Sequence, residues 1–145
     1  SACPFMFMAD FKNKKWIFAN YRSNTAEIYD FSEIIDYRVI LRSKGTKVLM
    51  GEQRILSSAP DGNGGVLQSE ALNSDNCEYI AIEWKLQGKS AAAVPTKIVM
   101  YECQDSDGNL RRSDFIFPQV CIDNAIQLEQ WLHEIQACKK GETEK

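Results

Sequence analysis

The amino-acid sequence predicts one mostly-β domain, built from bent antiparallel sheets and closed by a C-terminal α-helix. Three observations lead to this fold class. Short segments rich in aromatic and β-branched residues alternate with polar turns over residues 5–50. The same pattern resumes after Asn76, beyond a loop-rich stretch. The chain then ends in a segment, residues 123–140, whose apolar side chains recur at helical spacing.

The first three strands follow one another closely. Residues 5–11 carry three phenylalanines on one face, and residues 16–21 are rich in aromatic and branched side chains. The polar residues 12–15 separate these two segments, which predicts a hairpin. Residues 26–30 form a third short strand after another polar connection.

Residues 31–36 predict a compact turn or a single helical turn between the third strand and the fourth. Over residues 37–42 apolar and basic side chains alternate, which is typical of a half-buried strand. Residues 43–46 turn the chain and residues 47–50 return it. We expect this pair to be antiparallel, because the link is too short for a parallel crossover.

Residues 51–76 interrupt the strand pattern and are predicted as a loop-rich insertion. Residues 59–65 contain one proline and three glycines, which is a strong loop signal. Residues 66–72 are compatible with a short helix or with irregular structure.

The second half supplies further strands. Over residues 79–86, Ile80, Ile82, Trp84 and Leu86 alternate with Tyr79, Ala81, Glu83 and Lys85. Residues 97–103 predict another strand, residues 105–109 a turn, and residues 114–118 a last apolar strand.

The final helix has the clearest pattern. Asp123 is a suitable N-cap and Gly141 a suitable terminator, and Lys139 and Lys140 complement the negative end of the helix dipole. One apolar stripe is formed by Ala125, Leu128, Trp131, Leu132, Ile135 and Cys138. We expect this stripe to lie against the sheets. The predicted domain spans residues 1–141, followed by a disordered tail at residues 142–145.

Composition excludes several classes of protein. The chain has 145 residues, a net charge of −3 and a pI near 5.2, which argues against a nucleic-acid partner. No apolar run approaches the roughly 18 residues that a membrane-spanning helix needs. Residues 1–8 are typical of a first strand rather than a secretion signal. We therefore expect a cytoplasmic protein.

The cysteines and the single histidine do not form a recognisable site. The five cysteines are widely spaced, without a Cys-x-x-Cys pair, and are interpreted as free buried thiols in a reducing compartment, although the spacing also allows one disulfide. His133 is expected to face solvent. Residues 105–109 resemble a calcium loop superficially, but they lack the distal glutamate that provides the bidentate ligand. The sequence thus predicts no catalytic residue, no metal and no cofactor.

A basic cluster in the first 47 residues is the one candidate binding feature. We expect the turns at residues 12–15 and 43–46 to emerge at the same end of a sheet, with Arg38 and Arg42 nearby. Such a rim would bind an anion, an acidic lipid or an acidic peptide. Ordinary solvated turn charge is the simpler interpretation. The residues of this candidate anion-binding rim are Lys12, Lys14, Lys15, Arg22, Lys44 and Lys47.

The order of short antiparallel strands, a mid-chain loop, more strands and a closing helix with Trp131 resembles the pleckstrin-homology-like (PH-like) fold. The segment 26–39, with its phrase Phe-Ser-Glu-Ile-Ile-Asp-Tyr, also looks like one common in bacterial PH-like domains of unknown function. This resemblance implies a bent barrel plugged by the C-terminal helix. The first loop, residues 12–15, is shorter than in PH domains that bind phosphoinositides.

Three hypotheses about function follow from the sequence. The first is a non-catalytic interaction domain that binds a protein segment along a sheet edge or beside the helix. The second is binding of an anionic ligand or an acidic membrane surface through the basic turns. The third is a small-ligand carrier or an enzyme that uses the barrel interior.

Overall fold

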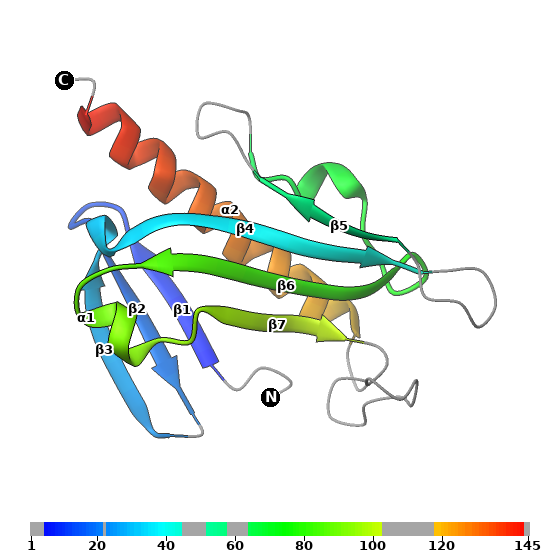
Figure 1. Ribbon diagram of the computed structural model, residues 1–145, viewed down its shortest axis with the longest axis horizontal. Coiled ribbons are helices and arrows are strands. Elements are labelled where there is room, and N and C mark those ends of the chain that lie inside the picture. Colours follow the sequence, from blue (N-terminus) through cyan, green and yellow to red (C-terminus); the bar gives the residue numbers. More distant parts are fainter. Residues whose placement is uncertain (1–4, 22, 45–51, 58–63, 103–117, 144–145) are drawn as a thin grey trace.

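The computed structural model describes residues 5–21, 23–44, 52–57, 64–102 and 118–143. Figure 1 shows their arrangement as two sheets with one long helix. The elements in chain order are β1 (Phe5–Asp10), β2 (Lys15–Asn20), β3 (Thr25–Asp30), the 3-10 helix η1 (Phe31–Glu33), β4 (Ile34–Ser43), β5 (Gln53–Leu56), the 3-10 helix η2 (Gln68–Glu70), β6 (Cys77–Leu86), α1 (Lys89–Ala93), β7 (Lys97–Glu102) and α2 (Pro118–Thr143).

The strands form two antiparallel sheets, as the sequence predicts. One sheet has the order β1-β2-β3, and the other has the order β5-β4-β6-β7. The first sheet ends at β1 and the second at β7, and no pairing joins these two edges among the described strands. The described strands therefore form an open pair of sheets, and the closed barrel that the resemblance implies is not found.

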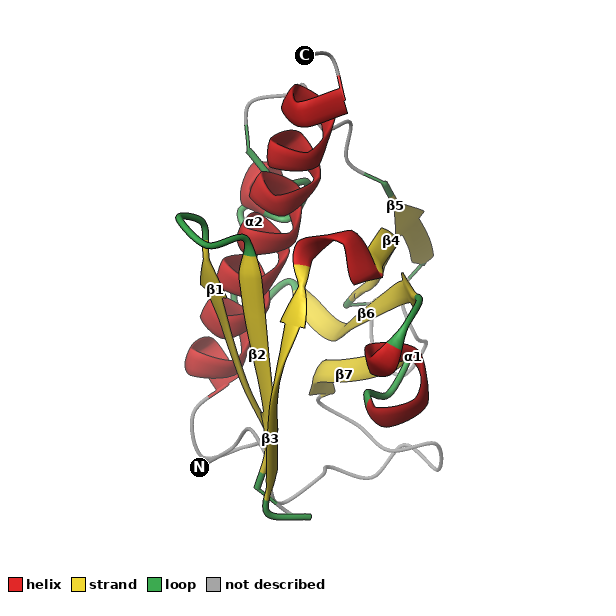
Figure 2. Cartoon of the chain, turned by 90° about the vertical axis from the view of Figure 1, so that its left-hand side faces the viewer, coloured by secondary structure: helices red, strands yellow, loops and turns green. Residues whose placement is uncertain are grey.

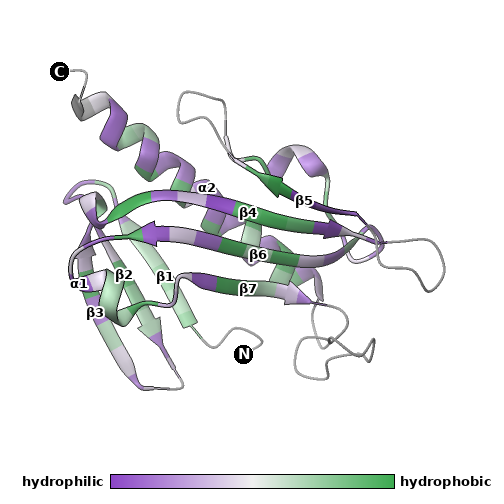
Figure 3. Ribbon diagram, viewed as in Figure 1, coloured by the Kyte–Doolittle hydropathy of each residue, from purple (hydrophilic) through white to green (hydrophobic). Residues whose placement is uncertain are grey.

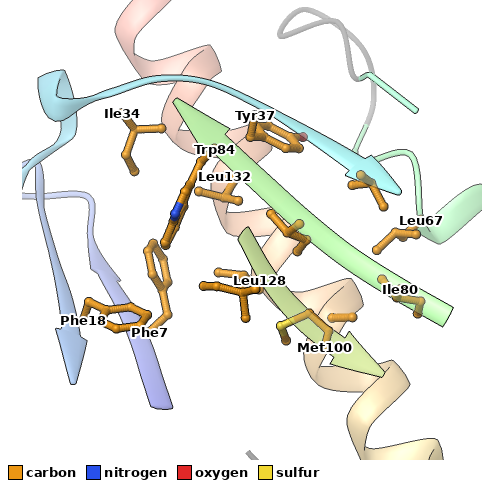
Figure 4. Packing of buried hydrophobic residues seen from close by; sticks show 14 of the residues in the cluster. Phe7, Phe18, Ile34, Tyr37, Leu67, Ile80, Trp84, Met100, Leu128 and Leu132 are labelled. Atoms are coloured by element: carbon orange, nitrogen blue, oxygen red, sulfur yellow. The ribbon is translucent and has the colours of Figure 1, made fainter. Parts of the chain in front are cut away.

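The core lies between the sheets and α2, and aromatic rings fill its centre (Figure 4). Trp16 of β2 is fully buried and contacts Phe7 of β1 and Trp84 of β6, with ring centroids 5.6 Å and 5.5 Å away. Leu128 and Leu132 of α2 close the core from the third side. The apolar stripe of α2 thus packs against the sheets, as predicted, and Trp131 packs at its margin against Phe7.

The segment Phe-Ser-Glu-Ile-Ile-Asp-Tyr, residues 31–37, forms the corner between the two sheets. Phe31 and Ile34 enter the core. The side chain of Glu33 accepts hydrogen bonds from the backbone N–H groups of Asp30 and Ser90, both at 2.9 Å, and thereby ties η1 to α1. Gly88 has φ 72°, and a Cβ there would lie 2.9 Å from Glu33 Oε1, so this approach requires glycine.

Glu33 makes the stability of the fold depend on pH. Burial raises the pKa of this carboxyl group, but the hydrogen bonds from Ser90 and Asp30 outweigh burial and bring the pKa below its ordinary value of 4.5. A group whose pKa is lower in the folded state stabilises the fold above its unfolded pKa. That contribution is lost as the pH falls through the folded pKa.

We therefore expect wild type to be more stable than Glu33→Gln at neutral pH, by about 1 kcal/mol. This difference in unfolding free energy should shrink as the pH falls below 4.5, the ordinary pKa of the group. Urea titrations at a series of pH values measure it. A difference that stays constant down to about pH 3 would contradict the role of Glu33.

Helix α2 begins earlier and ends later than predicted. It starts at Pro118, which suits a first turn because the missing N–H has no partner to lose. Asp123 therefore does not cap the helix, and its carboxylate accepts a hydrogen bond from Gln119 one turn earlier. Gly141 lies inside the helix, and two residues of the predicted tail, 142 and 143, belong to it as well.

The second half of α2 is held against the start of β4. Gln136 Nε2 donates to the carbonyl of Ile35 at 2.9 Å, and Lys139 Nζ donates to the carbonyl of Ile34. These carbonyls lie where the pairing of β4 with β6 shifts register, between Ile34 and Asp36. At this irregularity the carbonyl groups of Ile34 and Ile35 accept hydrogen bonds from the side chains of α2 instead.

The predicted strands differ from the structure in a few places. The strand that returns to β4 is β5, at residues 53–56, so the predicted insertion contains a strand. It also contains η2, within the segment predicted as a short helix or irregular. Helix α1 was not predicted. The predictions for residues 47–50, 105–109 and 114–118 fall outside the described residues, apart from Pro118, which begins α2.

Candidate functional site

A groove lies between the two sheet edges and the long helix. It has a volume of about 270 Å³, and we call it the β1 groove. Edge strand β1 forms one wall, α2 forms the other, and β7 contributes Met100. Figure 2 shows α2 running beside β1. The groove is lined by Phe5, Met6, Phe7, Tyr21, Met100, Asn124, Gln127, Leu128 and Trp131.

The strand wall follows from the alternation of side chains along β1. Phe5 and Phe7 point inward, where Phe5 stacks on Phe18 at 5.3 Å between ring centroids and Phe7 contacts Trp131 at 6.0 Å. β1 is the first strand of its sheet and, among the strands that the structure describes, has a neighbour on one side only. Backbone groups on the other side of an edge strand are available to a further strand.

The helix wall follows from the spacing of side chains along α2. Asn124, Gln127 and Trp131 recur at intervals of three and four, so they share one face of the helix. Asn124 and Gln127 are exposed, and Trp131 is half-buried. None of the lining residues that the structure describes carries a charge. The groove therefore suits an uncharged apolar segment whose backbone can bond to β1 and to the two amides.

Two further grooves adjoin the β1 groove. One, of about 210 Å³, shares Phe5 with it and extends to Pro95 and Ile98. A third groove, of about 520 Å³, shares Phe18 and Asn20 with the 210 Å³ groove and lies between the β2–β3 hairpin and α1.

A buried polar cluster fixes the far side of α2. The carboxyl group of Glu129 is fully buried and accepts hydrogen bonds from the Tyr37 hydroxyl at 2.5 Å and from the Leu67 N–H at 3.0 Å. Gly65 lies directly against this carboxyl group, because a Cβ there would come within 2.0 Å of Glu129 Oε1. The cluster joins α2, β4 and the segment before η2. It is a structural connection rather than a pocket.

His133 is buried, with 4% of its surface exposed, so the prediction that it faces solvent is wrong. The preceding turn of α2 is covered on a second face, where Glu129 accepts a hydrogen bond from the Leu67 N–H and Gln130 from the Gly65 N–H. His133 lies one turn after Glu129 on this covered face. The spacing of Glu129 and His133 was the available sequence signal for a second buried helix face.

Among the described residues of the predicted anion-binding rim, Lys44 lies apart from the lysines of the β1–β2 turn. Lys12, Lys14 and Lys15 are exposed around the β1–β2 turn, and Lys15 forms an ion pair with Asp30. The carbonyl of Lys14 accepts a hydrogen bond from Phe31, close to the start of β4. Lys44 follows the other end of β4, about 30 Å away for a ten-residue strand (Figure 1). Arg22 and Lys47 lie outside the described residues.

The described cysteines agree in part with the prediction of buried thiols. Cys77, Cys121 and Cys138 are not joined by disulfides; the first two are buried, and Cys138 is half-buried. Cys3 and Cys103 lie outside the described residues. Across the described part of the chain, no three His, Cys, Asp or Glu side chains are arranged to hold a metal ion. No helix in the same residues is long and apolar enough to cross a membrane.

No protein-family model, curated protein or solved structure matches this chain. The site therefore rests on its own geometry. Sequence reasoning did not identify the β1 groove, although β1 carried a signal. Its run Phe-Met-Phe-Met-Ala is apolar on both faces, which is typical of a strand that is covered on both sides. Yet Met8 is 50% exposed.

Proposed function

We propose that this chain is a non-catalytic, PH-like protein-binding domain that takes up an extended segment of a partner protein in the β1 groove. The single observation that carries the proposal is an edge strand bordering an uncharged apolar groove, opposite a helix face with two exposed amides. The order of two antiparallel sheets and a closing helix supports the PH-like type. The proposed location is the cytoplasm, where cysteines such as Cys77, Cys121 and Cys138 stay reduced.

Each part of the groove supplies one element of recognition by strand addition. In this mode, backbone hydrogen bonds to an edge strand provide affinity, and pockets for alternate side chains provide specificity. β1 supplies the edge. Phe5, Phe7 and Trp131 supply an apolar pocket, and Asn124 and Gln127 can bond to the outer side of the added backbone.

A second candidate is uptake of a small apolar molecule, because the adjoining grooves extend past Phe5 and Phe18 towards the space between the sheets. The anionic alternative has less support, since Asp10 and Asp30 lie beside Lys15 in neighbouring strands and offset the positive charge of the β1–β2 turn. Flotation with acidic liposomes tests that alternative, and salt-sensitive association that is lost in Lys14→Glu would favour it.

Filling the groove should abolish peptide binding. Gln127 is exposed on α2, so Gln127→Trp places a large ring in the β1 groove without disturbing the core. Peptides enriched from a displayed library of random dodecapeptides should bind this variant at least about tenfold more weakly than wild type. Fluorescence anisotropy with the labelled peptides measures this affinity.

Asp123→Trp is the matched control, because Asp123 is exposed on the same helix but does not line the groove. Its affinity should equal that of wild type, with both variants folded by circular dichroism. The proposal fails if the library yields no specific peptide, or if enriched peptides bind Gln127→Trp as tightly as wild type.

A further inference from the structure

Side chains on the outer face of the β1-β2-β3 sheet form rows that run across the three strands, with β1 at one end of each row. Met8 pairs with Ile17, which pairs with Ile28, and Met8 and Ile28 are 50% and 56% exposed. The next row is Met6, Ala19 and Ala26. Both rows are wholly apolar, whereas the outer face of an antiparallel sheet is usually polar. Figure 3 shows the hydrophobic character along β1 and β2.

The row at the far end of the same sheet is charged. Asp10 pairs with Lys15, which pairs with Asp30, so the charges alternate across the three strands. Lys15 forms its ion pair with Asp30, on the side away from Asp10. The pKa of Asp10 is lowered by hydrogen bonds from the Asn13 side chain and backbone and from the Lys12 N–H, which outweigh a smaller rise from burial, so this carboxylate is charged at neutral pH.

We infer that the segment bound at β1 is a short strand with a basic residue opposite Asp10, followed by apolar residues opposite Met8 and Met6. This inference rests on the proposed function and names the chemistry of its partner. Opposite charges stabilise cross-strand pairs and like charges destabilise them. A basic residue beside Asp10 would continue the alternation of charge by one strand, and apolar residues would extend the two apolar rows.

The inner face of β1 sets the remaining positions of the bound strand. Side chains opposite Phe5, Phe7 and Ala9 point towards the core side, where the described lining of the β1 groove is mostly apolar and uncharged. The bound strand is therefore apolar on both faces, unlike an amphipathic strand. All described strand pairs are antiparallel, and antiparallel pairing is slightly more stable than parallel pairing. We therefore expect the bound strand to run antiparallel to β1. The expected sequence, read from its N-terminus, is one basic residue and then five apolar residues.

Three synthetic peptides test this assignment. The first has a lysine followed by Val-Val-Leu-Val-Leu between polar Ser-Gly ends, and the other two replace the lysine by glutamine or by glutamate. Anisotropy titrations of wild type should rank the lysine peptide first and the glutamate peptide last. We expect a difference of about three- to tenfold between these two, because the attractive lysine pair and the repulsive glutamate pair each change the affinity by up to about fivefold, in opposite directions.

Asp10→Asn separates the charge of Asp10 from its role in the turn. Asparagine keeps an oxygen that can accept the hydrogen bonds from the Lys12 and Asn13 N–H groups, which are both 3.1 Å long. In this variant the lysine and glutamate peptides should bind within about twofold of each other. Asp75→Asn is the control for net charge, since Asp75 is exposed in the segment before β6, and it should keep the wild-type ranking.

The outcomes distinguish this inference from the proposed function. If the peptides bind wild type and Gln127→Trp blocks them, but the glutamate peptide binds as tightly as the lysine peptide, the basic position is wrong and the groove stands. If Asp10→Asn leaves the ranking unchanged, the lysine contacts another group and the inference is overturned. If none of the three peptides binds wild type while library-enriched peptides do, the inference is overturned and the groove stands. If neither set of peptides binds, both proposals fail.

Discussion

Replacing Glu129 by alanine should lower the unfolding free energy by about 2–4 kcal/mol. The substitution leaves the Tyr37 hydroxyl and the Leu67 N–H without their acceptor in a fully buried position. Unsatisfied buried donors cost about 1–3 kcal/mol each. Urea unfolding followed by tryptophan fluorescence measures the effect. A loss below about 1 kcal/mol would show that the segment before η2 is not held by this carboxyl group.

Gly65→Ala provides an independent check of the same contact. A Cβ at this position would lie 2.0 Å from Glu129 Oε1, so the single variant must displace the carboxyl group. In the Glu129→Ala background that atom is absent, and adding Gly65→Ala should cost little more. The two losses should therefore be strongly non-additive. Gly141→Ala is the contrasting control, because no described residue beyond the neighbouring helix backbone lies within 4 Å of its Cβ position, and alanine favours the helix.

The second large effect is expected at the centre of the core. Trp16 is fully buried between the sheets, contacts the rings of Tyr29 at 4.7 Å and Trp84 at 5.5 Å, and donates a hydrogen bond to the carbonyl of Asp30. Trp16→Ala should cost about 3–5 kcal/mol, because it removes the contacts of a large ring and leaves a cavity. Thermal and urea unfolding measure the loss.

Ile28→Ala is the matched control for Trp16→Ala. Ile28 lies in the neighbouring strand β3 but is 56% exposed on the outer face, so truncation removes little buried area. We expect a change of about 0.5 kcal/mol or less. Equal losses in the two variants would mean that Trp16 does not join the sheets.

Local sequence patterns predicted most of the strands. The hairpin of β1 and β2, and strands β3, β4, β6 and β7, follow from alternation and turn residues over short stretches. Both predicted ends of α2 were wrong. Asp123 resembles an N-cap and Gly141 a terminator, but the helix already begins at Pro118 and continues to Thr143. Helix α1 is five residues long and depends on Gly88 and on Glu33, 57 residues before Ser90. Such a contact has no local signature.

The candidate site was not predictable for the same reason. The β1 groove joins Phe5 and Phe7 to Met100 and Trp131, from segments about a hundred residues apart in the sequence. Glu129 likewise meets Leu67 and Tyr37 across 62 and 92 residues. The basic residues were visible in the sequence, but their separation along β4 became apparent only from the strand order.

Amide hydrogen exchange at the sheet edges tests strand addition most directly. Unpaired amides of an edge strand exchange rapidly, and pairing slows them. With the lysine peptide at saturation, we expect slower exchange at alternate residues of β1, between Phe5 and Asp10, and no change along β3. Protection that appears on β3 or β5 instead, or none on β1 when the peptide is bound, would contradict the assignment of the β1 groove as the binding site.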